Sequence, residues 1–294
     1  MPPHPLSSPL TPHPTSRCTA QYQGEANVRQ APYYACLLSH LAGDFISGFQ
    51  QNGTGAFGAG RFFVVQLHAW NASTDPSNVY YYQALAGLRV AQQVGVSSAP
   101  GAELVSAIDG GDPLAPATSI HPRGKQLPGH RLALAIVARR YGAQAVEYAA
   151  PRYSTATASA QGLALEVSVL VSSSAGSTDM QLVWVPPSPA SNSSRCPTDL
   201  GVLPIMCAGF EIMLSDGAFP NGTWIPAAVE ISAQESALTL KATAPRAGLV
   251  AAGTRNGWGA WPVVNVYSAD SRLPLLPWQE RVPQQWPLPQ GKAA

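Results

Sequence analysis

Two short polar clusters contain the side chains that could carry out catalysis. The first is the segment 23–27, which reads Gln-Gly-Glu-Ala-Asn and stands before an expected helix. The second is the segment 119–126, whose His121 follows an expected strand that ends at Asp109. A loop histidine with a carboxylate to orient it can act as a general base. Taken singly, the clusters are also compatible with a capped turn and an ordinary surface loop.

Residue spacing argues against a metal site and a nucleotide site. The six histidines form no HExxH pattern and the four cysteines form no CxxC pair, so the ligand spacing of a zinc site is absent. The chain has no GxxxxGK[ST] loop, and the glycines over 53–60 neither follow a clear strand nor open a helix. The GxSxG elbow of common serine hydrolases is also missing. We therefore expect no metal and no bound nucleotide.

The first half of the chain alternates between helical and strand patterns. Apolar residues at helical spacing predict helices over 34–50, 79–94 and 129–141. Continuous apolar runs predict strands over 62–70 and 104–109, covered on both faces as in a parallel sheet. This order of elements predicts an α/β fold.

Beyond residue 142 the apolar period changes from helical to two. Leu163, Leu165, Val167, Val169 and Val171 alternate with polar residues, which predicts a strand with one buried face. Short strands separated by Gly, Pro, Asn and Asp clusters favour a β-sandwich. The other strands that we expect are 181–185, 210–214, 228–232, 237–242 and 248–252.

These patterns divide the chain into four parts. We expect a disordered Pro-rich start over 1–20, an α/β domain over 21–142, a β-sandwich domain over 143–282 and a disordered tail over 283–294.

Composition limits the classes of partner. The formal net charge is +1 and only 11% of the residues are charged, which argues against nucleic acid and against an anionic membrane surface. No apolar run approaches the roughly 20 residues that cross a bilayer. A small neutral or polar ligand suits this composition better.

The signals for cellular location disagree. The N-terminus lacks the apolar core of a signal peptide, whereas the cysteines and the N-x-S/T sequons fit an exported protein. The sequons stand at Asn52, Asn71, Asn192 and Asn221. A parent protein that is secreted or held in a lysosomal or vacuolar lumen, and whose beginning is missing here, reconciles both signals. Cys196 and Cys207 are close enough in sequence to form a disulfide there, with two buried thiols as the alternative.

The two clusters and their surroundings together resemble one family. Tyr22 to Asn27 reads YQGEAN, and the segment 120–126 reads IHPRGKQ. With the matching positions, they look like the sialate O-acetylesterase family over roughly residues 21 to 280. The other matching positions are Tyr34, Cys36, Leu37, Val65–Leu67, Ile108–Gly110, Gly129, Arg131, Leu132, Tyr141, Gly142, Phe210–Ile212, Asp216, Gly217, Trp258, Pro262, Asn265, Tyr267, Leu273, Pro274 and Pro277.

The resemblance implies a partial flavodoxin-like SGNH-hydrolase domain followed by a β-sandwich domain. It implies hydrolysis of O-acetyl esters of sialic acid or other sugars by serine acyl transfer, with an acetylated sugar as partner and no cofactor. His121 would be the general base, Asp109 the carboxylate that orients it, and Gln23 a donor to the oxyanion. Surrounding or substrate-binding positions would be Gly24, Glu25, Asn27 and Lys125.

The sequence departs from the family pattern at three places. The family's serine stands in an early GQSN-like segment, and only a Pro-rich stretch precedes Gln23 here. Thr118 occupies the position three residues before the histidine, where the SGNH pattern often has Asp. Ala20 and Gln21 replace the usual Trp before the YQGE block. We therefore expect a truncated chain that is weakly active or inactive alone.

Two other functions fit the same residues. One is a non-catalytic glycan-binding protein, in which exposed tryptophans stack on sugar rings. Its candidates are Trp184, Trp224, Trp258 and Trp261. The other is an interaction module joined to a separate chain that carries the serine. The oligomeric state is left open.

Overall fold

The computed structural model describes most of the chain. The described residues are 18–51, 61–71, 79–143, 145–173, 180–188, 192–216, 222–232 and 236–283. The expected disorder over 1–17 and 284–294, and the sequons at Asn52 and Asn221, lie outside these ranges. No helix among the described residues is long and apolar enough to cross a membrane.

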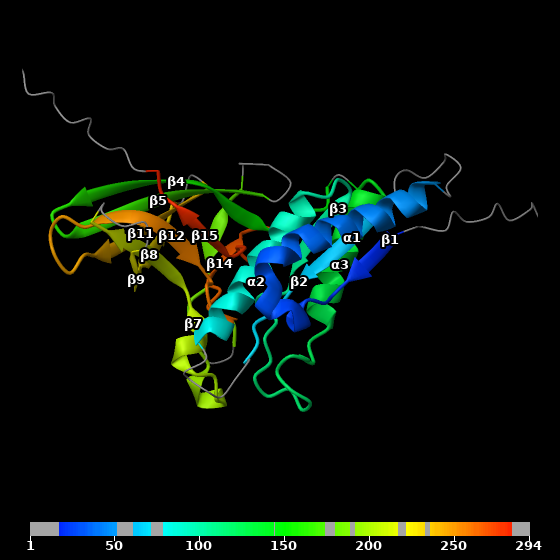
Figure 1. Ribbon diagram of the computed structural model, residues 1–294, viewed down its shortest axis with the longest axis horizontal. Coiled ribbons are helices and arrows are strands. Elements are labelled where there is room, and N and C mark those ends of the chain that lie inside the picture. Colours follow the sequence, from blue (N-terminus) through cyan, green and yellow to red (C-terminus); the bar gives the residue numbers. More distant parts are fainter. Residues whose placement is uncertain are drawn as a thin grey trace, which may run out of the picture.

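The first half forms a three-stranded parallel sheet with helices on both faces (Figure 1). Its strands, in spatial order, are β1 (Cys18–Gln21), β2 (Arg61–Gln66) and β3 (Ala102–Ser106). Alternate residues of β2 point to opposite faces, as strand geometry requires. Phe62 and Val64 pack with α1 (Ala31–Gln51) and α2 (Val79–Ser97), and Phe63 and Val65 pack with α3 (Gln126–Arg140). A short 3-10 helix, η1 (Glu25–Gln30), precedes α1.

Two expectations for this half are wrong in detail. Residues 18–20, expected to be disordered, belong to β1, because hydrogen bonding to β2 orders a segment whose own sequence is a poor strand former. The expected strands 62–70 and 104–109 are shorter, since the chain leaves the sheet after Gln66 and after Ser106.

Helix α1 buries only part of its apolar surface. Leu38 and Ile46 are buried as predicted, but Leu37, Leu41 and Phe45 of the same predicted face are exposed. Periodicity identifies the apolar face of a helix, but it does not show whether another element covers the whole of it.

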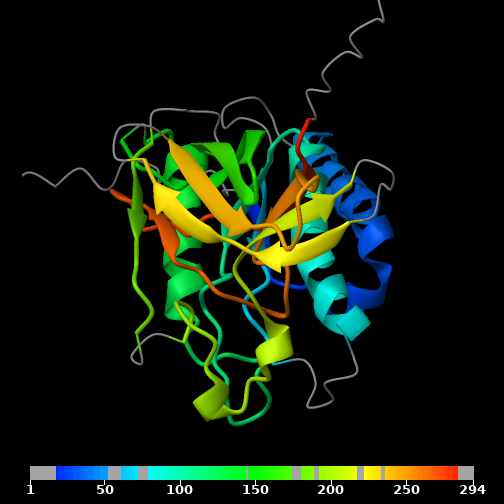
Figure 2. The same ribbon diagram turned by 90° about the vertical axis from the view of Figure 1, so that its left-hand side faces the viewer.

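The second half consists mainly of two four-stranded antiparallel sheets packed face to face (Figure 2). One sheet has the order β10 (Ala228–Ile231), β11 (Ala237–Thr243), β5 (Ala164–Ser173), β4 (Pro151–Gln161). The other has the order β15 (Trp278–Arg281), β12 (Val250–Asn256), β8 (Phe210–Ser215), β9 (Thr223–Pro226). Two pairs of short strands complete this half: β7 (Cys207–Ala208) with β13 (Trp261–Pro262), and β6 (Leu182–Trp184) with β14 (Val266–Ser268).

Alternation along β5 explains the core between these sheets. Leu165, Val167, Val169 and Val171 are fully or almost fully buried and pack against residues of the opposite sheet, including Ile212. Leu163 was predicted to share this face, but it lies in the turn before β5 and is exposed.

One hydrophobic cluster extends across both halves. Trp261 and Leu276 of the second half pack in the same cluster as Leu85 and Leu88 of α2. Between the halves, Cys196 and Cys207 form a disulfide with a Cα–Cα distance of 5.7 Å. Two short 3-10 helices, η2 (Thr198–Leu200) and η3 (Pro204–Met206), lie inside this disulfide loop. The second half therefore packs directly against the α/β half.

Candidate functional site

Loops that follow the three parallel strands meet at one end of the sheet. In open α/β sheets, ligands bind beyond the carboxyl ends of the strands. Here that end carries Tyr22 to Glu25 after β1 and His68 after β2. The long connection from β3 to α3 adds the segment 119–125, which lies below the sheet in the view of Figure 1. Both polar clusters from the sequence therefore belong to this end.

The turn after β1 depends on a glycine and on a network of amides. Gly24 has a φ of 146°, and a Cβ there would lie 3.1 Å from the Tyr34 hydroxyl oxygen, so a larger residue would be strained. The Gln23 side chain donates to Asn27 Oδ1 at 3.0 Å and accepts from Gln21 Nε2 at 2.8 Å. The predicted oxyanion donor is therefore exposed at the site, with its amide turned toward Asn27.

A buried histidine connects the three loops. The Tyr22 hydroxyl lies 2.7 Å from His68 Nδ1, and His68 Nε2 lies 3.2 Å from the Ser119 carbonyl oxygen. His68 is only 1% exposed, and this burial lowers its pKa to about 3, so the ring is neutral. The Ser119 hydroxyl in turn bonds to the backbone of Asn71 at 3.1 Å. From the sequence, His68 was a candidate only for zinc binding, and its role as a connection between loops was not predicted. A polar residue near the end of the apolar run 62–70 is the sequence signal that could have identified His68.

Arg89 of α2 lies fully buried beneath the same loop. Its guanidinium donates to the carbonyl oxygens of Leu67 (2.9 Å), His68 (2.6 Å), Gly259 (2.7 Å) and Ala260 (2.9 Å). Burial lowers the pKa of Arg89 to about 9, so the side chain still carries its charge at neutral pH. Arg89 therefore ties the loop after β2 to a loop of the second half.

His121 is exposed at this end of the sheet. Its backbone N–H donates to the Thr118 carbonyl at 2.9 Å. Burial raises the pKa of Glu25, whereas Lys125 and His121 act on it in the opposite direction, so these three groups lie within electrostatic reach of one another. The Lys125 ammonium lies 4.8 Å from the centre of the Tyr22 ring. The Lys125 amine and the Glu25 carboxylate thus both lie near Tyr22.

Asp109 has a different partner from the predicted one. Arg131 of α3 donates to both of its carboxylate oxygens, at 2.6 and 2.8 Å, and also to the Ser106 carbonyl at 2.7 Å. Because Arg131 is buried, its charge needs this counterion. No hydrogen bond joins a carboxylate to His121 within the described ranges. Asp109 therefore anchors α3 in this structure and does not orient the histidine.

The described serines at this end have other hydrogen-bond partners. The buried Ser106 hydroxyl donates to Gln66 Oε1 at 2.7 Å, and that of Ser119 donates to the Asn71 carbonyl. Neither hydroxyl is paired with His121.

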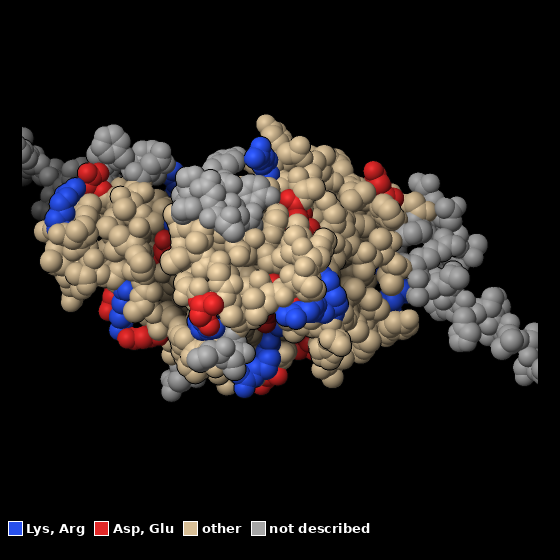
Figure 3. Space-filling model, turned by 90° about the horizontal axis from the view of Figure 1, so that it is seen from below, with Lys and Arg blue, Asp and Glu red and all other residues tan. Residues whose placement is uncertain are grey.

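Among the described residues, no three His, Cys, Asp or Glu side chains gather as a metal site would require. The face seen from below is mostly uncharged, with scattered acidic and basic side chains (Figure 3).

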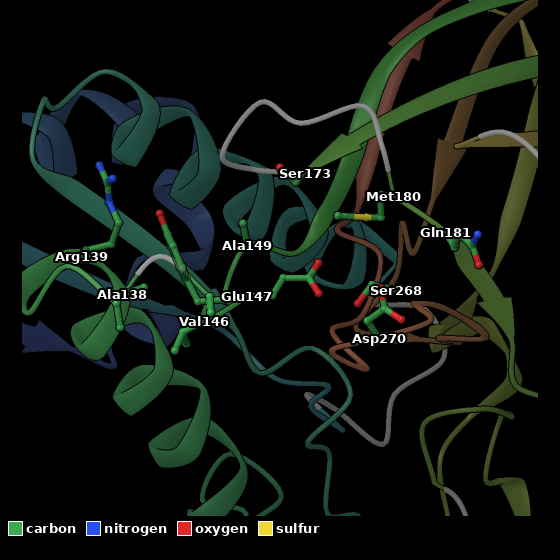
Figure 4. A pocket seen from close by; sticks show the side chains of 13 residues that line it. Ala138, Arg139, Val146, Glu147, Ala149, Ser173, Met180, Gln181, Ser268 and Asp270 are labelled. Carbon is green, nitrogen blue, oxygen red and sulfur yellow. The ribbon is translucent and has the colours of Figure 1, made fainter.

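A cavity of about 460 Å³ lies elsewhere, beside the end of α3 and the start of the second half. Figure 4 shows the Glu147 carboxylate pointing toward Ser268 and Asp270, while Arg139 points away from them. The cavity contains no residue predicted for the site, so cavity size does not identify the place of the chemistry here.

Comparison with protein-family models and with curated proteins finds no match. Among solved structures, the chain is similar to XAC1771, described as a novel carbohydrate acetylesterase from Xanthomonas citri. The TM-score is 0.62 at 23% sequence identity, and the match covers 91% of this chain and 50% of that protein. The likeness shows a shared fold, and the chain spans about half the length of that protein. The narrower resemblance to sialate O-acetylesterases stays a prediction.

Proposed function

We propose that this chain is part of a carbohydrate esterase that removes O-acetyl groups from sugars, sialic acid among them. The observation that carries the proposal is the convergence of Gln23, Glu25, His121 and Lys125 beyond the carboxyl ends of the parallel strands. The fold that places them there is similar to that of a protein described as a carbohydrate acetylesterase. Fold likeness alone does not define an activity, so the proposal rests mainly on the site residues.

The proposed reaction is acyl transfer to a serine. His121 takes the proton from the serine hydroxyl as its oxygen attacks the acetyl carbonyl. The side-chain amide of Gln23 donates to the oxyanion of the tetrahedral intermediate, after turning from Asn27. Collapse of the intermediate breaks the ester bond, and His121 returns the proton to the leaving sugar oxygen. Water, activated by His121, then releases acetate and restores the serine.

The proposal places the serine outside the described residues. The described sheet ends at β1, whose second edge has no strand beside it among the residues that the structure describes. On α1, Tyr33 (71% exposed), Leu37 (55%) and Leu41 (40%) follow one another at helical spacing. An unpaired edge and an exposed apolar stripe are what a further strand and helix would cover. We propose that polypeptide docked on this side carries the serine.

Hydrolysis of an aryl acetate and of an O-acetylated sialic acid tests the proposal. The 294-residue chain and the product of a longer natural transcript are assayed in parallel, each also as His121→Ala. The matched control is His130→Ala, because His130 is likewise exposed but lies on α3. We expect activity in the longer product that His121→Ala lowers by about 10³-fold or more and that His130→Ala leaves unchanged. Activity that survives His121→Ala would contradict the assignment of the base.

Glycan binding without catalysis is a second candidate function. It is favoured by Trp184, which is 41% exposed, whereas Trp261 is fully buried and Trp224 stacks on Arg255 at 4.3 Å. Isothermal titration with acetylated and free sugars would distinguish the two functions. Binding that Trp184→Ala abolishes and that His121→Ala leaves unchanged, in a protein without esterase activity, would favour glycan binding.

A further inference from the structure

We infer that His68 positions the loop that carries the proposed base His121, through a hydrogen bond from its Nε2–H to the Ser119 carbonyl. The inference rests on the proposed function for its catalytic consequence, but its structural content can be tested without any activity. Nothing in the spacing of the motifs singles out His68, because it lies 53 positions before His121 in the sequence. Only the fold brings its ring to the Ser119 backbone.

The contacts of His68 define which ring nitrogen carries the proton. A carbonyl oxygen can only accept a hydrogen bond, so the nitrogen 3.2 Å from the Ser119 oxygen, Nε2, must be the donor. In a neutral ring the other nitrogen, Nδ1, is then an acceptor, and the Tyr22 hydroxyl at 2.7 Å supplies its proton. The Ser119 carbonyl therefore fixes the tautomer of His68, and the Tyr22 hydroxyl completes the arrangement as a donor.

The surroundings of His68 keep it neutral. The ring is buried, and the positive charges of Arg89 and Lys125 oppose a further positive charge on it. Arg89 also donates to the His68 carbonyl at 2.6 Å, so the backbone and the side chain of this residue are both held. A neutral ring with a fixed tautomer can serve as a rigid donor across the range of pH in which an esterase histidine works.

The loop of His121 is held at two points of different strength. On one side, the Ser119 carbonyl accepts a hydrogen bond from His68, and the Ser119 hydroxyl donates one to the Asn71 carbonyl. These contacts are buried or partly buried. On the other side, Arg123 pairs with Asp112 at 2.7 Å, and Arg123 is mostly exposed. Exposed ion pairs contribute little, whereas an unmade buried hydrogen bond is costly. Ser119 and Arg123 each stand two residues from His121, so the more deeply buried contact, that of His68, should control the place of His121 more than the ion pair does.

The first test measures the tautomer of His68 by the ¹⁵N chemical shifts of its ring in the 294-residue chain. We expect one protonated nitrogen, Nε2, with no change between pH 5 and pH 8. A proton on Nδ1, or a ring that titrates within this range, would overturn the inference. This outcome does not depend on esterase activity, so failure here and failure of the proposed function are distinguishable.

The second test compares two substitutions that each keep one end of the ring. In His68→Gln the amide nitrogen can take the place of Nε2 and donate to Ser119, while in His68→Asn the shorter amide can meet Tyr22 but not Ser119. We expect amide hydrogen exchange at His121 to be about tenfold faster in His68→Asn and close to wild type in His68→Gln. Asp112→Asn, which weakens the exposed anchor, is the control and should change this exchange by less than about twofold.

Ester hydrolysis then shows the catalytic consequence in whichever product is active. His68→Asn should lower kcat roughly 10- to 100-fold with KM nearly unchanged, because the base is misplaced while the substrate still binds, and His68→Gln should recover most of it. Equal kcat and equal exchange at His121 in His68→Asn and wild type would overturn the inference. So would a loss of kcat in both variants with unchanged exchange, since that would place His68 in another role.

Discussion

The core of the β-rich half and the polar residues beneath the carboxyl end of the parallel sheet are both buried, but they consist of different groups. Between the two antiparallel sheets, β5 contributes only Leu and Val, and the facing strands contribute further apolar residues. At the carboxyl end of the parallel sheet, Gln66, His68, Arg89, Gln92 and Ser106 are almost completely buried. Their hydrogen bonds run largely to loop and strand-end backbone. The first arrangement stabilises the fold, and the second holds loops in place at a cost in desolvation.

Arg89→Met should have the largest effect on stability. The substitution removes the donors to four buried carbonyl oxygens, and we expect the free energy of unfolding to fall by about 4 kcal/mol. Urea unfolding followed by circular dichroism measures it. Arg139→Met is the control, because Arg139 is a partly exposed arginine in an ion pair and should cost at most about 1 kcal/mol. Equal losses in the two variants would mean that Arg89 does not tie the loops together.

Leu165→Ala tests the apolar region of the comparison. Leu165 is fully buried between the two sheets, so its truncation should lower the free energy of unfolding by about 3 kcal/mol. Leu170→Ala on the same strand, where the side chain is 45% exposed, should cost less than about 1 kcal/mol. The Leu165 variant should keep the His121 amide exchange of the wild type at low temperature, and faster exchange there would show that the two regions are coupled.

Asp109→Asn separates an anchor from a member of a catalytic triad. The substitution leaves the buried Arg131 without its counterion, and we expect a loss of about 3 kcal/mol in the free energy of unfolding. If Asp109 oriented the base, the same substitution would instead lower kcat by about 10⁴-fold. A stable variant with such a loss of kcat would restore the sequence-based role of Asp109.

Acid should destabilise the end of the parallel sheet through His68. Its pKa is depressed to about 3 in the folded protein from a usual value of 6.5, so below pH 6.5 the unfolded chain binds a proton that the folded one does not. Stability is therefore full above pH 6.5 and is lost as the pH falls toward 3, by about 1.5 kcal/mol between pH 6.5 and pH 5. His68→Gln should remove this part of the pH dependence. The same pH dependence in both proteins would contradict a buried neutral His68.

Leu37→Ser should have the smallest effect. The side chain is 55% exposed on α1, so the free energy of unfolding should change by less than about 0.5 kcal/mol in the 294-residue chain. If polypeptide in a longer product covers this face, the same substitution should cost about 1 kcal/mol or more there. A large loss already in the 294-residue chain would show that the stripe is covered within it.

Local patterns predicted most elements because each pattern has its own physical cause. Alternation of Leu and Val with polar residues identified β5, since only one face of that strand meets the core. The same rule missed β4, which buries little more than Pro151 and Ala156 and is held by its hydrogen bonds to β5. Strand β1 was missed for the same reason, because its order comes from β2.

For the candidate site, the sequence by itself determined the residue types and their order: the turn around Gly24, the loop with His121, and the disulfide candidates Cys196 and Cys207. The tertiary structure alone decided their partners. Asp109 pairs with Arg131, and His68 bonds to Tyr22 and Ser119. Arg89 lies beneath two loops, one from each half of the chain. The physical reason is that a buried polar group needs a hydrogen-bond partner, and the segment that supplies it can be far away in the sequence. Sequence spacing therefore does not identify the partner.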